Sequence, residues 1–401
     1  TRDAELDIDN DLSKSFIEKI SSSVEHRKTS DPVRFVYDKS IAKDTLNFLK
    51  EKMNIEDTDS VIPGGRYHNR RDYMSFPSLG RQDLLYDKIK ALPVKGLTME
   101  GSLFENIAKK DYLQYTPYHT FSYIIKFLRE AALDPKVRNI KITVYRLANN
   151  SQVAASLINA VKNRKQVTVQ IELQARFDEQ ANIEYAEQLQ AEGVKLIFGV
   201  PGLKVHSKIC LIEREEDNII KRYGFISTGN FNEATAIANA KAGKEAYIKI
   251  KMNSFTSYKM VDKLYEASNA GVKIQLIIRG ICCLIPGVKG MSENIEAISV
   301  VDKFLEHPRE FIFANNGDPK VYISSADWMT RNLDYRVEVG CPIYDKDIKQ
   351  ELIDTFEISW SDNLKARVFS EKQDNAYKKI IGPEVRSQFV LYDYYKTKLE
   401  S

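Results

Sequence analysis

The sequence predicts an α/β fold with two like domains, preceded by a smaller, partial α+β head segment. Three observations lead to this prediction. From about residue 93, short apolar runs alternate with amphipathic stretches of helical period, as in strands joined by helices. The same scheme starts again near residue 246. The chain, at 401 residues, is long enough for two to four domains.

We expect three parts, at residues 1–90, 91–238 and 239–401. Each of the last two should hold a mostly parallel or mixed sheet with helices on both faces, because near-continuous apolar strands need cover on both sides. The two should be related by an internal repeat. In such sheets ligands collect at the carboxyl ends of the strands.

The head segment should contain a helix near residues 11–22, a strand at 32–37 and a helix at 43–53. It opens as if in the middle of a longer structure, so we expect further sequence before it. The loop at 63–73 is rich in Gly, basic and aromatic residues. Its donors could meet phosphate, and an anchored turn between two elements is an equally good account.

The first domain should alternate strands with helices, and the second domain should repeat this order. In the first, we expect strands at 140–145, 167–173, 194–200 and 221–228, one further strand that holds residue 206, and helices at 154–162 and 183–192. In the second, we expect strands at 246–252, 272–278 and 337–341, two strands around a turn at 315–318, and helices at 261–267, 294–304, 348–360 and 383–399. Pro342 should stop the strand at 337–341.

Composition narrows the class of protein. The 59 basic residues nearly balance 56 acidic ones, and a net charge of +3 is too small to indicate a nucleic-acid partner. Four cysteines lie in apolar runs without metal-ligand spacing, which is typical of buried thiols in a reducing compartment. No apolar run approaches the roughly 18 residues that span a membrane. We expect a cytoplasmic protein, with peripheral membrane association left open.

The candidate catalytic residues are His206 and Lys208. An apolar strand would place them two apart on one face, so that an imidazole and an ammonium point together into a site. Histidine can attack an electrophilic phosphorus, and lysine can balance the charge that builds there. Ser227 and Asn230, at the end of the next strand, could donate hydrogen bonds to the same oxygens.

A degenerate second copy of this pattern follows about a hundred residues later. His307 and Arg309 stand for His206 and Lys208, and residues 324–328 stand for 227–231. Arg176 lies 30 residues before His206 (206 − 176), and Arg279 lies 28 before His307 (307 − 279). A lone histidine is more often a satisfied core residue. The paired context instead favours one phosphate site shared by the two halves.

Arginines at strand ends add to this prediction. Arg146 and Arg176 follow successive strands, and Arg331 and Arg336 follow the degenerate motif. A guanidinium gives two charge-assisted hydrogen bonds to one phosphate group. Any single arginine could equally form a surface ion pair, but two at neighbouring strand ends favour a phosphate cradle.

The order His-x-Lys, four residues, Glu213, then Gly229-Asn230 resembles the phospholipase D superfamily signature, with Glu where Asp is usual. Six segments together resemble the bacterial polyphosphate kinase of the first, phospholipase-D-like type, over nearly the whole chain. They are residues 64–69, 174–179, 201–208, 228–233, 279–287 and 324–332.

The resemblance implies two phospholipase-D-like domains and reversible transfer of the ATP γ-phosphate to polyphosphate, with Mg²⁺. It implies that His206 is the phosphohistidine nucleophile, His307 a second essential histidine acting as general acid and contacting ATP, and Arg279 a nucleotide-phosphate contact. Arg146 and Arg176 match the family's magnesium site. Because a guanidinium stays protonated, we interpret them as phosphate clamps beside the ion. The resemblance also implies ATP, ADP and polyphosphate as partners, no nucleic acid, and a homo-oligomer.

Two departures from the family pattern stand out. The family has an N-terminal domain and most of a head domain before the point where this chain starts. After Asn230 the family continues through a Tyr that stacks near ATP and several dozen further residues. Here the Tyr position holds Asn239, within a short join at residues 236–241.

Our leading hypothesis is two-step phosphoryl transfer through His206. The alternative is a phosphodiesterase acting on phospholipid or nucleic acid through the same fold, against which the degenerate second motif argues. A third possibility is a non-catalytic scaffold that binds polyanions. Release of choline or oligonucleotide cleavage without ATP would favour the second, and salt-sensitive polyphosphate binding without phosphoryl transfer the third.

Overall fold

The computed structural model describes residues 18, 21–22, 34–55, 60–66, 73, 76–148, 150–173, 179–200, 202–227 and 245–400. Arg176, Asn230, Asn239, most of the predicted helix at 11–22 and much of the loop at 63–73 lie outside these ranges. The chain forms two compact units. One holds residues 1–89 and 176–184, and the other holds residues 90–175 and 185–401.

The first unit contains a two-stranded parallel sheet and a helix. β1 (Arg34–Asp38) pairs with β2 (Ser60–Gly64), and α2 (Lys43–Lys52) follows β1, which confirms the predicted strand and helix. A 3₁₀ turn, η2, covers Gln82–Leu84. Arg66 Nε donates to Asp38 Oδ2 at 3.3 Å, so this part of the Gly-rich loop is anchored as a turn beside β1.

The second unit begins with a five-stranded sheet in the order β5-β4-β3-β7-β8. β3, β4 and β5 are parallel, β7 is antiparallel to β3, and β7 and β8 form a long hairpin. The strands are β3 (Val137–Val144), β4 (Gln166–Ile171), β5 (Lys195–Phe198), β7 (Lys208–Glu216) and β8 (Ile219–Ser227). The helices are α3 (Leu103–Ile107), α4 (Ser122–Leu133), α5 (Gln152–Lys162) and α6 (Glu179–Ala191).

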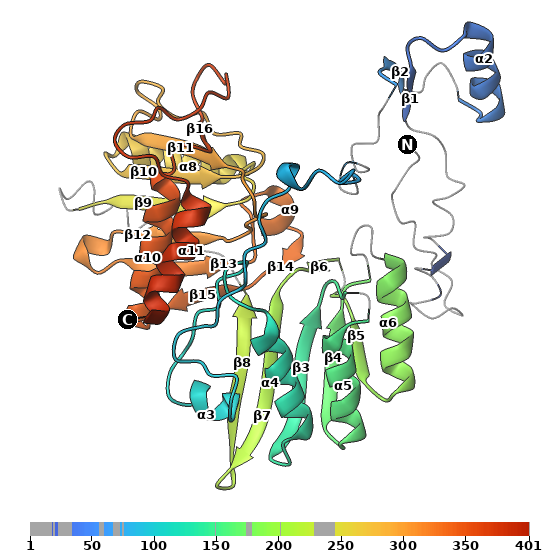
Figure 1. Cartoon of the computed structure of the whole chain (residues 1–401), viewed down its shortest axis with the longest axis vertical. Helices are drawn as coiled ribbons and strands as arrows, with labels where there is room; N and C mark the ends of the chain where they lie inside the picture. Colours follow the sequence, from blue (N-terminus) through green and yellow to red (C-terminus); the bar gives the residue numbers. More distant parts are fainter. Residues whose placement is uncertain are drawn as a thin grey trace. The chain divides into compact units, whose positions relative to one another are not determined.

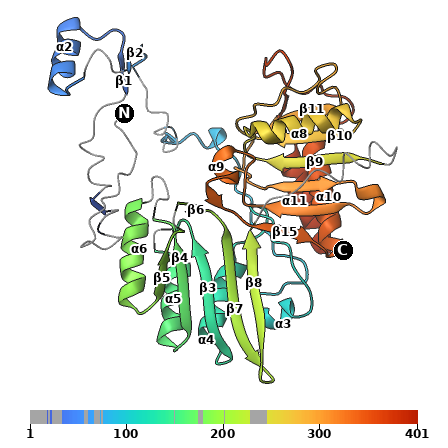
Figure 2. The same ribbon diagram turned by 180° about the vertical axis from the view of Figure 1, so that it is seen from behind.

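Helices α4 and α5 contact each other and lie over one face of this sheet (Figures 1 and 2). Ile140, Ile142 and Val144 of β3 are buried, whereas Lys141 and Thr143 between them are exposed or half-buried. Such alternation is the pattern of a sheet with one apolar and one polar face. One face of the first sheet is therefore more deeply buried than the other.

A seven-stranded sheet follows, in the order β15-β13-β12-β9-β10-β11-β16. β9, β10 and β11 are parallel, and the other pairs are antiparallel. The strands are β9 (Tyr247–Met252), β10 (Lys273–Ile278), β11 (Ile295–Val300), β12 (Glu310–Phe313), β13 (Lys320–Ser324), β15 (Gly340–Ile343) and β16 (Ala366–Val368). The long helices are α8 (Tyr258–Asn269), α10 (Lys346–Ser361) and α11 (Ser387–Glu400), and η3 (Asn315–Gly317) links β12 to β13.

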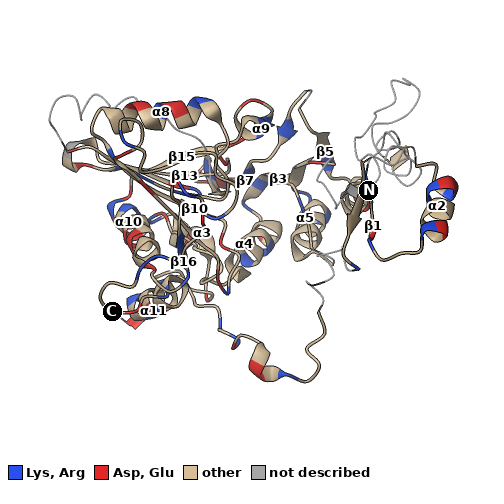
Figure 3. Cartoon of the chain, turned by 90° about the horizontal axis from the view of Figure 1, so that it is seen from above, with Lys and Arg blue, Asp and Glu red and all other residues tan. Residues whose placement is uncertain are grey.

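Helices cover both faces of the seven-stranded sheet, as predicted: α8 lies on one side, and α10 and α11 lie on the other (Figures 1 and 2). One core packs Val261 and Leu264 of α8 against Ile250 and its neighbours. The other packs Phe356 and Leu391 of the two C-terminal helices against the opposite face. Charges of both signs remain on the outer faces of α8 and α10 (Figure 3), in keeping with the small net charge.

The internal repeat is present in the sheets themselves. The order β11-β10-β9-β12-β13 has the same strand directions as β5-β4-β3-β7-β8. In both sheets three parallel strands are followed by an antiparallel hairpin, and a histidine stands just before the first strand of that hairpin. The predicted repeat is confirmed.

Two predicted elements of the second domain are wrong. Residues 294–304 were expected to form a helix, but Ile295–Val300 is strand β11, whose buried, partly β-branched side chains fit beside β10. Pro342 does not stop a strand at 337–341 but lies inside β15, opposite Tyr322. Because β15 is an edge strand, its proline costs no hydrogen bond of the sheet.

A segment that precedes the first sheet packs into the core of the second domain. Tyr115 and Tyr118 are buried in the cluster that contains Phe356 and Leu391. Their rings lie 5.9 Å from that of Tyr395 on α11. The two domains therefore share hydrophobic surface as well as the site between them.

Candidate functional site

His206 lies in a short link at the carboxyl edge of the first sheet. It follows β6 (Lys204–Val205), which pairs in parallel with β14 (Arg336–Val337) of the second domain. The backbone N–H groups of His206 and Ser207 donate to Val337 O at 2.9 and 3.0 Å. These bonds fix the histidine where the two domains meet.

The prediction that His206 and Lys208 belong to one continuous strand is wrong. The chain pairs with β14 up to His206 and enters the first sheet only at Lys208, the first residue of β7. The two side chains are still held together, because Lys208 Nζ donates to the backbone O of His206 at 2.5 Å.

Glu338 is the hydrogen-bond partner of the His206 ring. Its Oε2 lies 2.9 Å from His206 Nδ1, and its other oxygen accepts from Asn332 Nδ2 at 2.8 Å. Ser325 Oγ also donates to Oε2. Burial by itself would raise the pKa of Glu338, but the hydrogen bond from His206 lowers it, so this carboxyl is ionised.

This pairing sets the chemistry of the imidazole. A carboxylate at Nδ1 holds the proton on that nitrogen, which leaves the lone pair of Nε2 available. Burial lowers the pKa of His206 below its ordinary value, with Lys208 adding to the effect and Glu338 opposing it. At neutral pH the ring is therefore uncharged, with Nε2 able to act as a nucleophile.

Tyr145 lies at the end of β3 and contacts three candidate residues. Its ring is edge-to-face with that of His206, with centroids 5.2 Å apart. Lys208 Nζ lies 4.9 Å from the Tyr145 centroid, and the Arg146 guanidinium lies 5.7 Å from it. Tyr145 thus contacts His206, Lys208 and Arg146 at one edge of the sheet.

The pKa of Lys208 is lowered to about 8, chiefly by burial. The positive charges of Arg309, Arg336 and Arg146 contribute in the same direction, while Glu338 opposes them. Three arginines from both domains are thus close enough to Lys208 to repel its charge. Such a concentration of cations in a partly buried place is suited to an anion such as phosphate.

His307 lies at the corresponding edge of the second sheet, beside Arg279. The Arg279 guanidinium donates through Nε and Nη2 to Asn253 Oδ1 at 3.0 and 2.5 Å, and Nη2 lies 3.3 Å from His307 Nδ1. The pKa of His307 is lowered to about 4, chiefly by burial; the charges of Arg309, Arg279 and His206 act in the same direction, and Asp327 opposes them. The second histidine is also neutral at pH 7.

A buried ion pair supports this edge. Arg309 donates through Nε and Nη2 to the two oxygens of Asp327, both at 3.2 Å. Asp327 also accepts from the backbone N–H groups of Asn253 and Ser254 at 3.0 and 3.2 Å. Burial would raise the pKa of Asp327, but Arg309 lowers it, so the pair is charged. The network fixes Asn253, and through it Arg279.

The structure brings both histidines to one site. Ser325, whose Oγ donates to the Glu338 carboxylate at His206, stands two residues before Asp327, the partner of Arg309. Arg309 Nη1 in turn donates to the backbone O of His307 at 3.3 Å. Ser227 pairs with Lys208 across the β7–β8 hairpin and lies at the same edge. Eight predicted residues meet here. They are His206, Lys208, Arg146, Ser227, Arg336, His307, Arg309 and Arg279.

Three other predicted residues are not placed there. Arg331 lies on the short helix α9 (Thr330–Leu333) and is exposed, and none of the hydrogen bonds and ion pairs among the described residues joins it to either histidine. Asn230 and Arg176 lie outside the described residues.

Sequence reasoning missed Glu338, Tyr145 and Asn253. Tyr145 immediately precedes an arginine that was chosen, so the strand end itself was the signal. Glu338 gave no signal, because its contact with His206 spans 132 residues and depends on β14 pairing with β6. Asn253 could have been found as the first residue after an apolar strand that matches the one before Arg146.

The described residues do not fit a protein-ligated metal ion. Within the ranges that the structure covers, no group of three or more His, Cys, Asp or Glu side chains could hold one. Glu338 serves His206, and Glu172 accepts a hydrogen bond from Val205 N at 2.8 Å. Arg146 carries only donors. The site is built for an anion.

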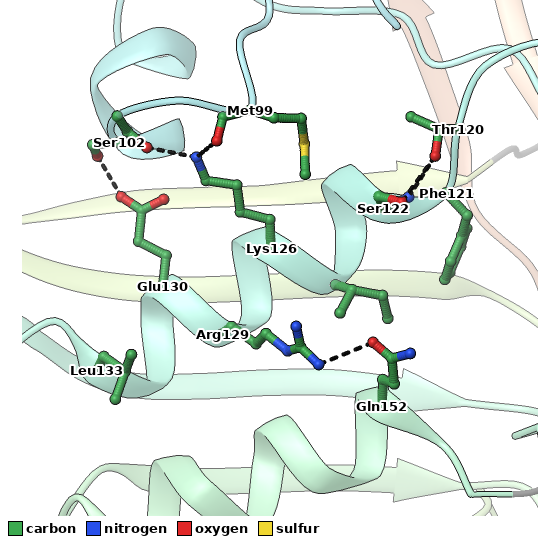
Figure 4. A pocket seen from close by; sticks show the side chains of 12 residues that line it. Met99, Ser102, Thr120, Phe121, Ser122, Lys126, Arg129, Glu130, Leu133 and Gln152 are labelled. Atoms are coloured by element: carbon green, nitrogen blue, oxygen red, sulfur yellow. Dashed lines mark hydrogen bonds between the residues drawn. The ribbon is translucent and has the colours of Figure 1, made fainter. Parts of the chain in front are cut away.

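A cavity of about 920 Å³ beside α4 shares no lining residue with the histidine site. Figure 4 shows it beside α4, where Lys126 donates to the backbone O atoms of Met99 and Gly101 and Arg129 donates to Gln152. Glu130 accepts from Ser102, the N-cap residue of α3. These bonds hold the loop before α3 against α4, so we assign this cavity no part in the chemistry.

The fold and the site define an α/β protein of two like domains that meet at a site lined by histidines and arginines. Three family models match the chain. They are the polyphosphate kinase middle domain over residues 1–76, C-terminal domain 1 over 102–243 and C-terminal domain 2 over 232–388. The chain belongs to the polyphosphate kinase family.

Named relatives agree with this assignment. The chain is 45% identical to polyphosphate kinase from Vibrio parahaemolyticus over 99% of its own length and 65% of that protein. It is 41% identical to polyphosphate kinase from Escherichia coli over 100% of its own length and 67% of that protein. The chain thus spans about two thirds of the length of these relatives.

A solved structure confirms the α/β architecture. The crystal structure of polyphosphate kinase from Porphyromonas gingivalis superposes with a TM-score of 0.82 at 34% identity. The match covers 92% of this chain and 65% of that one. Among the described residues, no helix is both long and apolar enough to cross a membrane.

Proposed function

We propose that this protein is a polyphosphate kinase that reversibly transfers the γ-phosphate of ATP to inorganic polyphosphate through a phosphohistidine at His206. The observation that carries the proposal is the Glu338–His206 pair, 2.9 Å apart, facing an arginine-rich edge of the second domain. Membership of the polyphosphate kinase family supports the choice of substrates.

In the first step Nε2 of neutral His206 attacks the γ-phosphorus. A P–N bond forms while the bond from that phosphorus to the bridging oxygen of ADP breaks. The Nδ1 proton stays between the ring and Glu338, which stabilises the positive ring that results. In the second step a terminal oxygen of polyphosphate attacks the phosphohistidine, so that a P–O bond forms and the P–N bond breaks.

The cations position the phosphates and stabilise the charge that moves onto their oxygens. Lys208, Arg146 and Arg336 lie on the His206 side, and Arg279 with His307 lies on the other. We assign Arg279 to nucleotide phosphate and His307 to the leaving-group side. Arg146 is a clamp on phosphate rather than a metal ligand.

Magnesium enters this proposal with the nucleotide. Mg²⁺ keeps several waters and is commonly held by substrate phosphates with one or two carboxylates. Among the described residues no group of three or more His, Cys, Asp or Glu side chains could hold the ion without the nucleotide. We therefore propose that Mg²⁺ is bound mainly by ATP and that it neutralises phosphate charge there.

The remaining assignments are also proposals. The functional division is 1–90, 91–238 and 239–401, supported by the separate five- and seven-stranded sheets. The protein is a cytoplasmic homo-oligomer, and peripheral association with the inner membrane is left open. The four cysteines are free, as expected in a reducing compartment. Sedimentation of the full chain checks the oligomer, and fractionation of cells checks the location.

Labelling with γ-³²P-ATP tests the central proposal. We expect acid-labile, base-stable label on the full chain, lost in His206→Ala. His119→Asn is the matched control, because His119 is also buried but serves the backbone N–H of Tyr115, at 3.0 Å. Label that persists in His206→Ala would contradict the assignment. So would cleavage of phospholipid or oligonucleotide without ATP.

A further inference from the structure

A small cavity lies behind the strand ends that carry His307 and Arg279. Its volume is about 20 Å³, enough for one water molecule, which needs roughly 10–15 Å³. A water also needs two to four polar partners. The polar lining comes from β9, α10 and α11, from the residue after β10 and from the link before β12, namely Lys251, Ser359, Ser387, Arg279 and Glu306.

Arg279 lines this cavity and has one donor that no described residue uses. Its Nε and Nη2 donate to Asn253, and Nη2 lies next to His307. The remaining nitrogen, Nη1, is buried and makes no hydrogen bond to any described residue. Burying an N–H donor without an acceptor is costly, so a partner in the adjoining space is expected.

Glu306 provides a matching acceptor on the cavity wall. Its Oε1 accepts from Tyr118 at 2.5 Å and its Oε2 accepts from Lys251 at 3.2 Å. Because an ionised carboxylate accepts about four hydrogen bonds, both oxygens have capacity left. Lys251 also donates to Ser359 at 2.9 Å, which fixes the opposite wall.

The charge balance favours a link between the two residues. Burial lowers the pKa of Arg279, and the positive charge of Arg309 lowers it further. The negative charges of Asp327 and Glu306 oppose this effect. Glu306 immediately precedes His307 in the chain. A hydrogen-bonded contact between Glu306 and Arg279 would therefore fix both the guanidinium and the backbone next to His307.

We propose that Glu306 is a positioning residue that orients Arg279 through a single bound water in this cavity. The water accepts from Arg279 Nη1 and donates to the Glu306 carboxylate. Asn253 on one side and the water on the other fix the plane of the guanidinium. This inference rests on the proposed function, because it assigns Arg279 to the nucleotide phosphates.

Two conservative variants of the full chain test this inference against one control. Glu306→Gln removes the charge but keeps the shape. Val300→Ile adds a methyl group to the cavity wall and displaces the water without touching a polar group. Glu310→Gln is the matched control, because Glu310 is another buried carboxyl close by in the chain that does not line the cavity, and burial raises its pKa.

The readout is the Kd for ATP by calorimetry, with kcat measured separately. We expect Glu306→Gln and Val300→Ile to weaken ATP binding roughly tenfold, the usual effect of losing one charge-assisted hydrogen bond, with a smaller change in kcat. Glu310→Gln should leave the Kd unchanged. Normal ATP affinity in folded Glu306→Gln, judged by its thermal transition, would overturn the inference.

A double variant separates positioning from a merely structural role. If Glu306 acts through Arg279, Glu306→Gln should weaken ATP binding no further in an Arg279→Ala background. A further tenfold loss there would overturn the inference. If the parent chain neither binds ATP nor labels at His206, the proposed function fails and this inference with it. A parent chain that does both, beside an unaffected Glu306→Gln, overturns this inference alone.

Discussion

Glu338 Oε2 lies 2.9 Å from His206 Nδ1, and the two residues belong to different domains. The proposed nucleophile is therefore oriented by a carboxylate that is brought to it by the pairing of β14 with β6. The proposed chemistry thus depends on this contact between the two domains.

We expect Glu338→Gln to lower the rate of phosphohistidine formation by roughly 10- to 100-fold, the usual effect of removing a group that orients a reactive histidine. The amide can donate to Nδ1, and the ring proton then moves to Nε2, which loses its lone pair. Single-turnover labelling measures the rate. Glu357→Gln on α10 is the control, because the Glu357 carboxylate pairs with Lys249 of β9. An unchanged rate in Glu338→Gln would refute this role.

The rate of labelling should follow a bell-shaped dependence on pH. Because the pKa of His206 lies below its ordinary value, the loss of rate on the acid side should occur at a pH below about 6.5. The pKa of Lys208 is about 8, so the basic limb should appear near that pH as the ammonium loses its proton. Lys208→Arg should keep partial activity and move the basic limb upward. A basic limb that stays in place would assign it to another group.

The free energy of unfolding should decrease as the pH is lowered from about 6.5 towards 4, partly because of His307. Its pKa is about 4 in the folded chain, against an ordinary value near 6.5. Between these values the unfolded chain binds more protons, so this stabilisation is complete above pH 6.5 and is lost as the pH falls towards 4. Urea unfolding at pH 7 and 5 measures the difference. His307→Gln should lose less stability than the parent between these two pH values, and an equal loss would contradict the prediction.

Arg309→Met should destabilise the protein strongly. It leaves Asp327 charged and buried without its main partner, which typically costs about 3–5 kcal/mol of the free energy of unfolding. Lys263→Met breaks an exposed pair with Glu266 and should cost about 1 kcal/mol or less. Urea titration compares the two variants. Similar midpoints for both would show that the buried pair contributes little.

Much of the fold could be predicted from local pattern. Apolar strands followed by polar or charged residues placed Arg146, Arg279 and both histidines at sheet edges. The helix expected at 294–304 failed because a short apolar run fits either element, and only the repeat decides between them. β5 begins 11 residues before His206 (206 − 195), and β11 begins 12 before His307 (307 − 295), so the two strands are counterparts.

Only those site residues could be predicted that stand out within one half of the repeat. His206 and His307 stood out because they occupy matching places in the repeat. Glu338 did not, because its role depends on a strand pairing between domains that leaves no periodic trace in the sequence. Tyr145 contacts His206 and Lys208 through its ring, and an aromatic residue at a strand end is ordinary core composition.

Tyr115 and Tyr118 belong to the first domain by sequence but complete the hydrophobic core of the second domain. They precede the first sheet in the chain, yet they complete the interior beneath α11 and bond the buried Lys251–Glu306 pair. A gene fragment that begins at residue 239 would lack Tyr115 and Tyr118. The apolar side chains that pack against them would be exposed to solvent, and the Lys251–Glu306 pair would lose two hydroxyl hydrogen-bond partners. Splitting the polypeptide between its halves would therefore yield insoluble material rather than two autonomous pieces.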